Sequence, residues 1–157
     1  MTLSKRARQF QDLLNARGLA LTVVELPDST RTADDAAAAL GCSKAQIVKS
    51  LVFRDTVTGR PVVVLASGPN LVDVTVIAAR HGAPIDKADA DFVKAATGYS
   101  IGGVPPIGHQ QPVTLFVDED LLTFDEVWAA AGTPHAVFKI PGKLTAILPE
   151  HTVLRVK

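Results

Sequence analysis

The sequence has a single cysteine and no net charge. Cys42 alone excludes an internal disulfide framework and is typical of a protein from a reducing compartment. Sixteen lysines and arginines balance sixteen aspartates and glutamates. Proteins that bind long stretches of nucleic acid are usually basic, because counterion release drives that binding. DNA is therefore not expected as a partner, whereas a small footprint, such as the single-stranded end of an RNA, stays open.

Long apolar runs are also missing. No stretch of about 18 apolar residues is present, and the basic segment 1–14 leads into no run of signal-peptide length. We therefore expect a cytoplasmic protein without a membrane partner. At 157 residues, 47% of them hydrophobic, the chain can form one core and is too short for two ordinary ones. Without linkers or repeats, residues 1–157 are predicted to form a single domain.

The common signatures of metal and cofactor sites are absent as well. There is no HExxH, paired CxxC, Walker loop, dinucleotide fingerprint or nucleophile elbow, so neither a metal nor a cofactor is expected. His81 is interpreted as a helix C-terminal residue and His151 as a solvated one. His109 and His135 each adjoin a turn rich in glycine and proline, and both remain candidate site residues.

Helical and strand patterns alternate along the chain, which indicates an α+β domain with a mixed sheet. The segment 124–131 (FDEVWAAA) is interpreted as a helix, and its Trp128 as a core residue rather than a stacking platform. Thr32 is expected to cap the helix 33–40 and Asn70 the helix 71–80. The remaining helices are predicted at 3–17 and 86–96. Strands are predicted at 19–26, 47–55, 61–68, 112–118, 135–140 and 152–156.

The segment 99–111 breaks this periodicity, with three glycines and two prolines in thirteen residues. Loops of this length inside a compact domain are usually functional. Glycine permits close approach of a ligand and proline stiffens the chain, so backbone N–H groups can be aimed at a phosphate or at an oxyanion. The alternative is a rigid turn between a helix and a strand.

Lys49 lies inside the apolar strand 47–55, on the same face as Ile47, Leu51 and Phe53. A lysine on a buried face is costly unless it is paired or lines a pocket. One interpretation is a fixed positive charge on a pocket floor, suited to phosphate or carboxylate. The other is an edge position from which the long side chain reaches solvent.

Several segments together are similar to the YbaK / prolyl-tRNA editing domain family. They are TADDAA (32–37), IVKSLV (47–52), the run from Gly98 to His109 containing GGVPPIGH (102–109), and AGTPH (131–135). The match runs in order from about residue 20 to the end. The fold it implies is α+β, a mixed, mostly antiparallel and barrel-like sheet with surrounding helices.

The resemblance implies a free-standing deacylase, needing no metal, that hydrolyses the ester between a wrong amino acid and the 3′ end of tRNA. Family members act mainly on tRNA for proline, so prolyl-tRNA synthetase is a possible partner. By resemblance, Lys49 holds the phosphate or ribose of the terminal nucleotide. The other residues that the resemblance places at the site are Thr32, Gly102, Gly103, Pro106, Gly108, His109, Gly132 and His135, with backbone N–H groups of the loop holding the carbonyl or the attacking water.

Two positions depart from the cysteine-removing branch of the family. Val137 stands where that branch tends to have an acidic residue, and His109 where it commonly has no histidine. These differences point away from a purely cysteine-specific activity. Two other functions stay open: a non-catalytic module that binds a tRNA end or a nucleotide, and a small hydrolase of other activated acyl esters.

Overall fold

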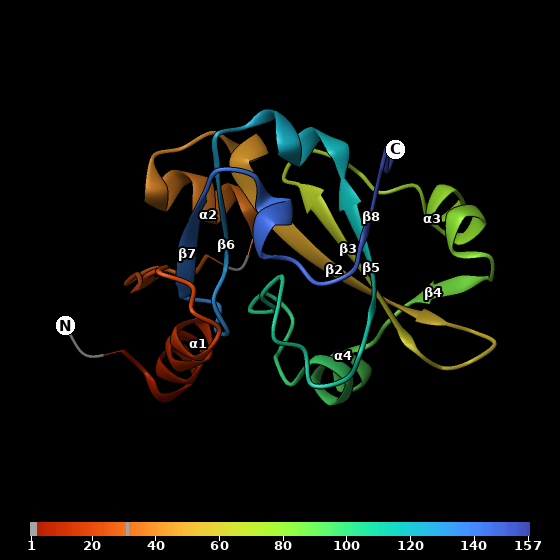
Figure 1. Ribbon diagram of the computed structural model, residues 1–157, viewed down its shortest axis with the longest axis horizontal. Helices are drawn as coiled ribbons and strands as arrows, with labels where there is room; N and C mark the ends of the chain where they lie inside the picture. Colours follow the sequence, from red (N-terminus) through yellow and green to blue (C-terminus); the bar gives the residue numbers. More distant parts are fainter. Residues whose placement is uncertain (1–2, 31) are drawn as a thin grey trace.

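The computed structural model describes residues 3–30 and 32–157, and four helices surround an eight-stranded mixed sheet (Figure 1). The helices are α1 (Lys5–Ala16), α2 (Ala33–Leu40), α3 (Val74–His81) and α4 (Ala90–Thr97). Single 3-10 turns occupy Lys44–Gln46, Glu119–Thr123 and Leu144–Ile147. The strands are β1 (Val23–Glu25), β2 (Ile47–Asp55), β3 (Pro61–Ser67), β4 (Ile85–Lys87), β5 (Thr114–Asp118), β6 (Glu126–Ala130), β7 (Ala136–Pro141) and β8 (Thr152–Leu154). The α+β fold expected from the sequence is confirmed.

The strands follow the order β1-β7-β6-β2-β3-β5-β8, and β4 pairs with β2 off this path. The pairs β1–β7, β6–β7, β2–β3 and β2–β4 are antiparallel. The pairs β2–β6, β3–β5 and β5–β8 are parallel. The predicted hairpin 47–55 with 61–68 is confirmed as β2 and β3.

The predicted helix at 124–131 is wrong, because residues Glu126–Ala130 form strand β6. Val127 and Ala129 are buried while their neighbours are half-buried, which is the period-two pattern of a strand. The alanines favour a helix by propensity, but pairing with β7 on one side and β2 on the other overrides it. Trp128 consequently lies on a strand, and its ring packs beside the buried Ala33, Ala36 and Ile47.

Two predicted helix starts also need correction. Helix α3 is capped by Asp73, whose carboxylate accepts a hydrogen bond from the amide of Thr75 at 2.9 Å, and not by Asn70. Residues Ile85–Lys87 form β4, and α4 begins only after Asp89, which caps it. By contrast, the predicted cap of α2 is confirmed, since the Thr32 hydroxyl accepts from the amide of Asp35 at 3.1 Å.

Buried side chains gather on both faces of the sheet. On one face Phe10 of α1 and Val93 of α4 belong to one buried cluster with Val63 and Leu65 of β3. On the other face Ile77 of α3 packs in a second cluster with strand residues. Within the described part of the chain, no helix is long and apolar enough to cross a membrane.

Strand β2 is paired unequally on its two sides. On one side β3 pairs with it from Val48 to Arg54. On the other side β6 pairs only with Ile47–Val48, and β4 only with Phe53–Asp55. Among the described residues, the middle of β2 thus has no strand neighbour on that side. The sheet is open there, at the position of Lys49 and Ser50.

Candidate active site

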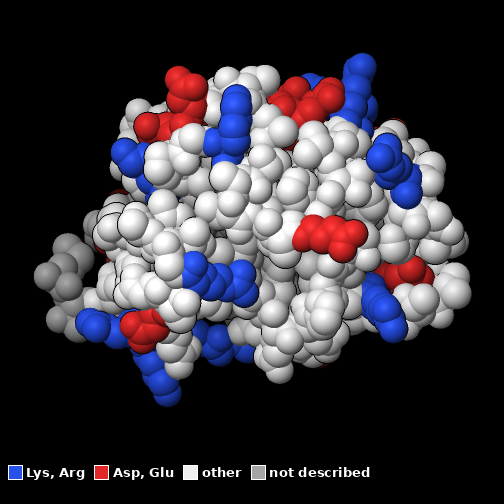
Figure 2. Space-filling model, viewed as in Figure 1, with Lys and Arg blue, Asp and Glu red and all other residues white. Residues whose placement is uncertain are grey.

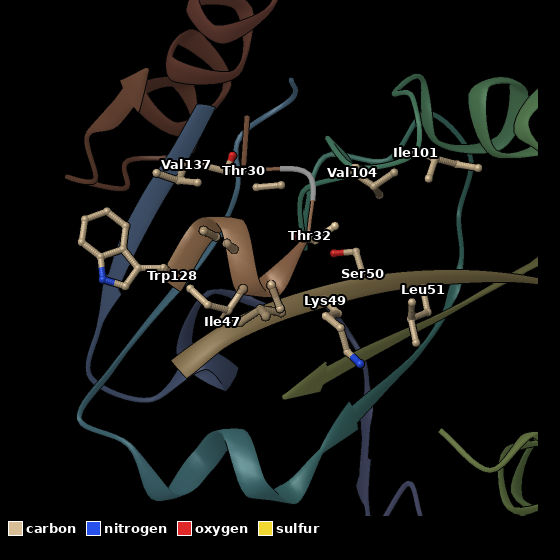
Figure 3. Close-up of a pocket in the computed structure, with 16 residues that line it drawn as sticks. Thr30, Thr32, Ile47, Lys49, Ser50, Leu51, Ile101, Val104, Trp128 and Val137 are labelled. Atoms are coloured by element: carbon tan, nitrogen blue, oxygen red, sulfur yellow. The ribbon is translucent and has the colours of Figure 1, made fainter. Parts of the chain in front are cut away.

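A cavity of about 310 Å³ lies at the open part of the sheet (Figure 3). Helix α2 contributes Ala33 and Ala36 to its wall, and β6 contributes the segment 128–130. The long loop contributes Ile101, Gly102 and Val104. The lining is mostly apolar with a few polar groups, as is typical of small-molecule sites. We call this space the first cavity.

A second cavity, of about 380 Å³, lies beside the first. Its wall comes from β2, the segment 71–74, β4 and α4. The two cavities share Lys49, Ser50, Leu51 and Ile101 as lining residues, so β2 and the tip of the loop stand between them. The arrangement is one cleft with two compartments that meet at Lys49 and Ser50.

The main chain of Ser50 faces the open edge of β2. Alternate residues of a strand direct their amide and carbonyl groups to the same side. The carbonyl of Val52 accepts from Ala88 on the β4 side at 3.3 Å, whereas the amide of Asp55 donates to Arg60 on the β3 side at 2.9 Å. The amide and carbonyl of Ser50 therefore point away from β3, into the cleft, where no strand of the described chain pairs with them.

The side chain of Ser50 points toward Thr32, and both residues line the first cavity (Figure 3). Sequence reasoning missed Ser50, because no histidine lies near it in the chain. The available signal was the alternation of β2, which puts Ser50 on the face opposite to Lys49. In Figure 3 Lys49 and Leu51 do leave the strand on the other side.

Lys49 lines both cavities, as the interpretation of a pocket charge requires, and it is half-buried. Its ammonium group donates a hydrogen bond to the carbonyl of Asn70 at 2.7 Å. Burial lowers the pKa of Lys49, repulsion from Lys44 lowers the pKa further, and attraction to Asp118 opposes both. The ammonium group of Lys49 is therefore fixed by Asn70 and partly removed from solvent, at the junction of the two compartments.

Asn70 belongs to a buried polar network that the sequence did not reveal. Its side-chain amide donates to the carboxylates of Asp118 at 2.7 Å and Asp120 at 2.8 Å. Asp118 is only 1% exposed and also accepts from the amide of Ser67 at 3.0 Å. Lys157 reaches the side-chain oxygen of Asn70 at 3.1 Å. The network fixes the turn after β3 and, through the carbonyl of Asn70, the position of Lys49.

The loop 99–111 presents only some of its backbone donors to the cleft. The amide of Gly103 is already used, since it donates to the carbonyl of Ser100 at 3.0 Å. The carbonyl of Gly103 accepts from the amide of Gly132 at 3.0 Å, which ties the loop to the turn after β6. Gly102, with φ of 90°, and Val104 line the first cavity, and no partner is found for their amides within 3–30 and 32–157. Of the two predicted donors, Gly102 is thus free and Gly103 is structural.

Residues 105–109 of the loop do not line either cavity, and their contacts support the shape of the loop. Pro106 is buried, and a Cβ on Gly108 would meet the Leu13 side chain of α1 at 2.7 Å. The His109 ring lies 2.8 Å from the Pro105 carbonyl, to which its Nε2 donates. Burial lowers the pKa of His109, against the effect of that hydrogen bond. None of Pro106, Gly108 and His109 lines either cavity.

The turn 131–135 likewise lies outside both cavities. Gly132 is buried with φ of 98° and supports the loop through its amide, while His135 is exposed. The amide of His135 donates to the Thr133 hydroxyl at 3.0 Å, and neither Gly132 nor His135 lines a cavity. Of the predicted site residues, the structure brings Thr32, Lys49 and Gly102 together at the cleft. The described residues contain no group of three or more histidine, cysteine or acidic side chains placed to hold a metal ion.

The model of the aminoacyl-tRNA editing domain family matches residues 27–147, which includes both cavities. The chain belongs to this family.

A solved structure named "Crystal structure of a putative trans-editing enzyme for prolyl tRNA synthetase" is 45% identical, with a TM-score of 0.91 over 99% of each chain. Among curated proteins, "Uncharacterized protein YwhH" of Bacillus subtilis (strain 168) is 28% identical over 77% of this chain and 76% of its own length. "Putative Cys-tRNA(Pro)/Cys-tRNA(Cys) deacylase EbsC" of Enterococcus faecalis (strain ATCC 700802 / V583) is 29% identical over 64% of this chain and 62% of its own. The structural relative extends the likeness over almost the whole chain.

Replacing Gly103 by alanine should destabilise the protein. The added Cβ would lie 2.9 Å from backbone atoms of Thr133, which cannot move without displacing the turn after β6. We expect Gly103→Ala to lower the free energy of unfolding by about 1–3 kcal/mol, measured by urea denaturation. Ser100→Ala is the matched control, because Ser100 is exposed and the variant keeps the carbonyl that Gly103 bonds. Equal stabilities of the two variants would contradict the close contact.

Replacing Asp118 by asparagine should disrupt the buried network. The carboxylate accepts hydrogen bonds from Ser67, Asn70 and Asp120, and an amide group there would turn one of its acceptors into a donor. We expect Asp118→Asn to cost about 1–3 kcal/mol of unfolding free energy. Asp120→Asn, at a half-exposed position, should cost less. If the two substitutions cost the same, Asp118 is not the centre of the network.

Proposed function

We propose that this protein is a trans-editing deacylase, which hydrolyses the ester of tRNA for proline carrying a small wrong amino acid such as alanine, cysteine, serine or threonine. The observation that carries the proposal is the two-compartment cleft with Lys49 and Ser50 at its junction, in a member of the editing-domain family. An aminoacyl ester joins two unlike parts, an amino acid and a nucleoside. A cleft with two compartments and polar groups between them suits such a ligand.

The reaction does not require a side-chain nucleophile. An aminoacyl ester is already activated, so a positioned and polarised water suffices. The water oxygen bonds to the carbonyl carbon, the bond from that carbon to the ribose oxygen breaks, and the ribose oxygen takes up the proton that the water loses. The amides of Gly102 and Val104, which have no partner among the described residues, are the candidate donors to the carbonyl oxygen as negative charge develops on it.

The positive charge of Lys49 suits the nucleotide part of the substrate. The Lys49 ammonium can bind the ribose or the phosphate of the terminal nucleotide, and its bond to Asn70 holds it in place before substrate arrives. Burial lowers the pKa of Lys49, and attraction to Asp118 opposes that effect. In the proposed role Lys49 acts on the substrate as a positive charge.

The first cavity supplies selectivity by size. Ala33, Ala36 and Ala129 leave a small space, and Val137 makes its wall apolar where an acidic residue would favour other side chains. A small pocket admits small side chains and excludes larger ones, which is the second sieve of editing. The apolar wall at Val137 supports alanine or a similar residue over a purely cysteine-specific activity.

The surface agrees with a small RNA footprint. On the face shown in Figure 2, lysines and arginines alternate with acidic residues and form no continuous basic patch. The balanced net charge favours contact with the single-stranded 3′ end alone rather than a long groove on the RNA. Selection of proline tRNA would then depend on few contacts or on prolyl-tRNA synthetase as a partner, a role that the name of the solved relative supports.

Deacylation of a panel of mischarged tRNAs tests the proposal. Wild-type protein should release free amino acid from at least one of alanyl-, cysteinyl-, seryl- or threonyl-tRNA for proline. Lys49→Ala should reduce the deacylation rate about 100-fold, because it removes a preorganised charge at the 3′ end of the tRNA. Lys5→Ala, on the exposed side of α1, is the control and should keep the rate. A non-catalytic module that only binds tRNA ends would protect the ester from hydrolysis. Hydrolysis of simple acyl esters without tRNA would instead indicate a small hydrolase of other activated esters.

His109 is expected to matter less. Its ring holds the loop through Pro105 and does not reach either cavity. His109→Ala should reduce the deacylation rate less than 10-fold, the loss that a supporting hydrogen bond of about 1 kcal/mol allows. A loss equal to that of Lys49→Ala would mean that His109 contacts the substrate.

A further inference from the structure

Trp128 is the only tryptophan of the sequence, and it lies in the wall of the first cavity. The sequence indicates a core residue, but the residue is half-buried and lines this space. Its neighbours in the wall are small, since β6 also contributes Ala129 and Ala130 and α2 contributes Ala33 and Ala36. Among the described residues that line the first cavity, Trp128 is thus the one aromatic side chain.

Trp128 stands at the end of the first cavity that is remote from Ser50. In Figure 3 its ring lies at one end of the lining and Ser50 near the other, with Ile47 between them. Residues that are far apart in one view are also far apart in space. Under the proposed function the ester lies at the polar groups of Lys49 and Ser50. The side chain of the bound amino acid then extends along the cavity toward Trp128.

The ring of Trp128 is held by neighbours from both adjoining strands. Its partner on β2 is Ile47, which belongs with Ala33 and Ala36 to the cluster against which the ring packs. Its partner on β7 is Lys139, whose side chain leaves the same face of the sheet. The Lys139 Nζ lies 5.7 Å from the ring centroid, within the range of a cation–π interaction. The ring is therefore fixed between α2 and a surface cation.

Lys139 is in turn directed by an acidic neighbour. Its ammonium lies 3.9 Å from the carboxylate of Glu126, and both side chains are about half exposed, at 49% and 45%. Glu126 stands two residues before Trp128 on β6 and so shares its face of the sheet. An exposed ion pair contributes little to the stability of a fold. The effect of this pair is to keep the Lys139 ammonium over the ring.

We propose that Trp128 is a specificity-determining residue, whose ring ends the space open to the amino-acid side chain, and that Lys139 is a positioning residue that keeps the ring there. The inference rests on the proposed function and names the group that limits the length of the side chain. A long side chain would have to push the ring out of its contacts with α2 and with Lys139. A short one, such as that of alanine, leaves these contacts intact.

Trp128→Ala tests the end wall, with RNA minihelices charged with alanine or leucine as substrates. It should raise the ratio of leucyl to alanyl deacylation about 10-fold or more, because a single methylene in an apolar pocket already has an effect of about this size. Trp128→Phe keeps an aromatic ring and should raise the ratio less, so it decides the matter if the alanine variant unfolds. Val153→Ala, at an exposed position outside both cavities, is the control and should keep the wild-type ratio. If the Trp128 variants slow both substrates by the same factor, the ring only supports the fold and the inference is wrong.

Lys139→Met tests the positioning role, because methionine removes the charge and keeps an unbranched side chain. The ratio of leucyl to alanyl deacylation should rise about two- to fivefold, the loss expected for a cation–π interaction at an exposed site. Lys139→Arg restores a cation over the ring and should return the ratio to the wild-type value. Lys94→Met, at an exposed position on α4, is the matched control and should change nothing. A wild-type ratio in Lys139→Met would refute the positioning role.

The fluorescence of the single tryptophan separates failure of this inference from failure of the proposed function. A minihelix that carries alanine through a non-hydrolysable amide should shift the emission of Trp128, and an uncharged minihelix should not. An emission shift in a protein that releases no amino acid would refute the deacylase and retain Trp128 as the wall of an aminoacyl site. Release of amino acid with an unchanged ratio in both Trp128 variants would retain the deacylase and refute the role of Trp128. Emission that stays unchanged while the amide minihelix is bound would also overturn the inference.

Discussion

The site depends on the incomplete pairing of one strand. β2 needs hydrogen-bond partners along both edges, yet β6 covers only its first two residues and β4 only its last three. A buried strand edge without partners is costly, so it persists only where water or a ligand can satisfy it. Here the open edge leaves the amide and carbonyl of Ser50 facing the cleft, and both cavities lie against it. The rest of the fold holds β6 and β4 apart: α2 packs against the β6 end, and the segment before α4 continues from β4.

The sequence predicted those parts of the site whose signals are local. A lysine within a run of apolar β-branched residues is costly anywhere but beside a pocket or at an edge, and Lys49 lines both cavities with its ammonium bonded to Asn70. The capping threonine of α2 follows from its own neighbours, and the structure places it on the first cavity. The glycine- and proline-rich loop was identified by its break in periodicity. Of its predicted residues, Pro106, Gly108 and His109 line neither cavity, and the His109 ring bonds to Pro105 of the same loop.

The parts that could not be predicted depend on contacts between distant segments. Strand β6 has a helical composition, and only its pairing with β2 and β7 makes it a strand. Asn70 follows a glycine and a proline and is read locally as a helix cap, whereas its partners Asp118 and Asp120 lie about fifty positions later. Ser50 carries no signal of its own, since its importance comes from where β6 ends and β4 begins.

The hydrogen bond between Gly103 and Gly132 joins two segments that are far apart in the chain. A Cβ on Gly103 would meet the backbone of Thr133, and a Cβ on Gly132 would meet Tyr99, so each glycine is confined by the other's segment. The loop lines the first cavity through Ile101 and Gly102, whereas the turn after β6 holds the loop from behind without lining the cavity. Over evolutionary time, substitutions in 99–103 and 131–134 should consequently be correlated, because the close contact of the two backbones leaves little room for an independent change.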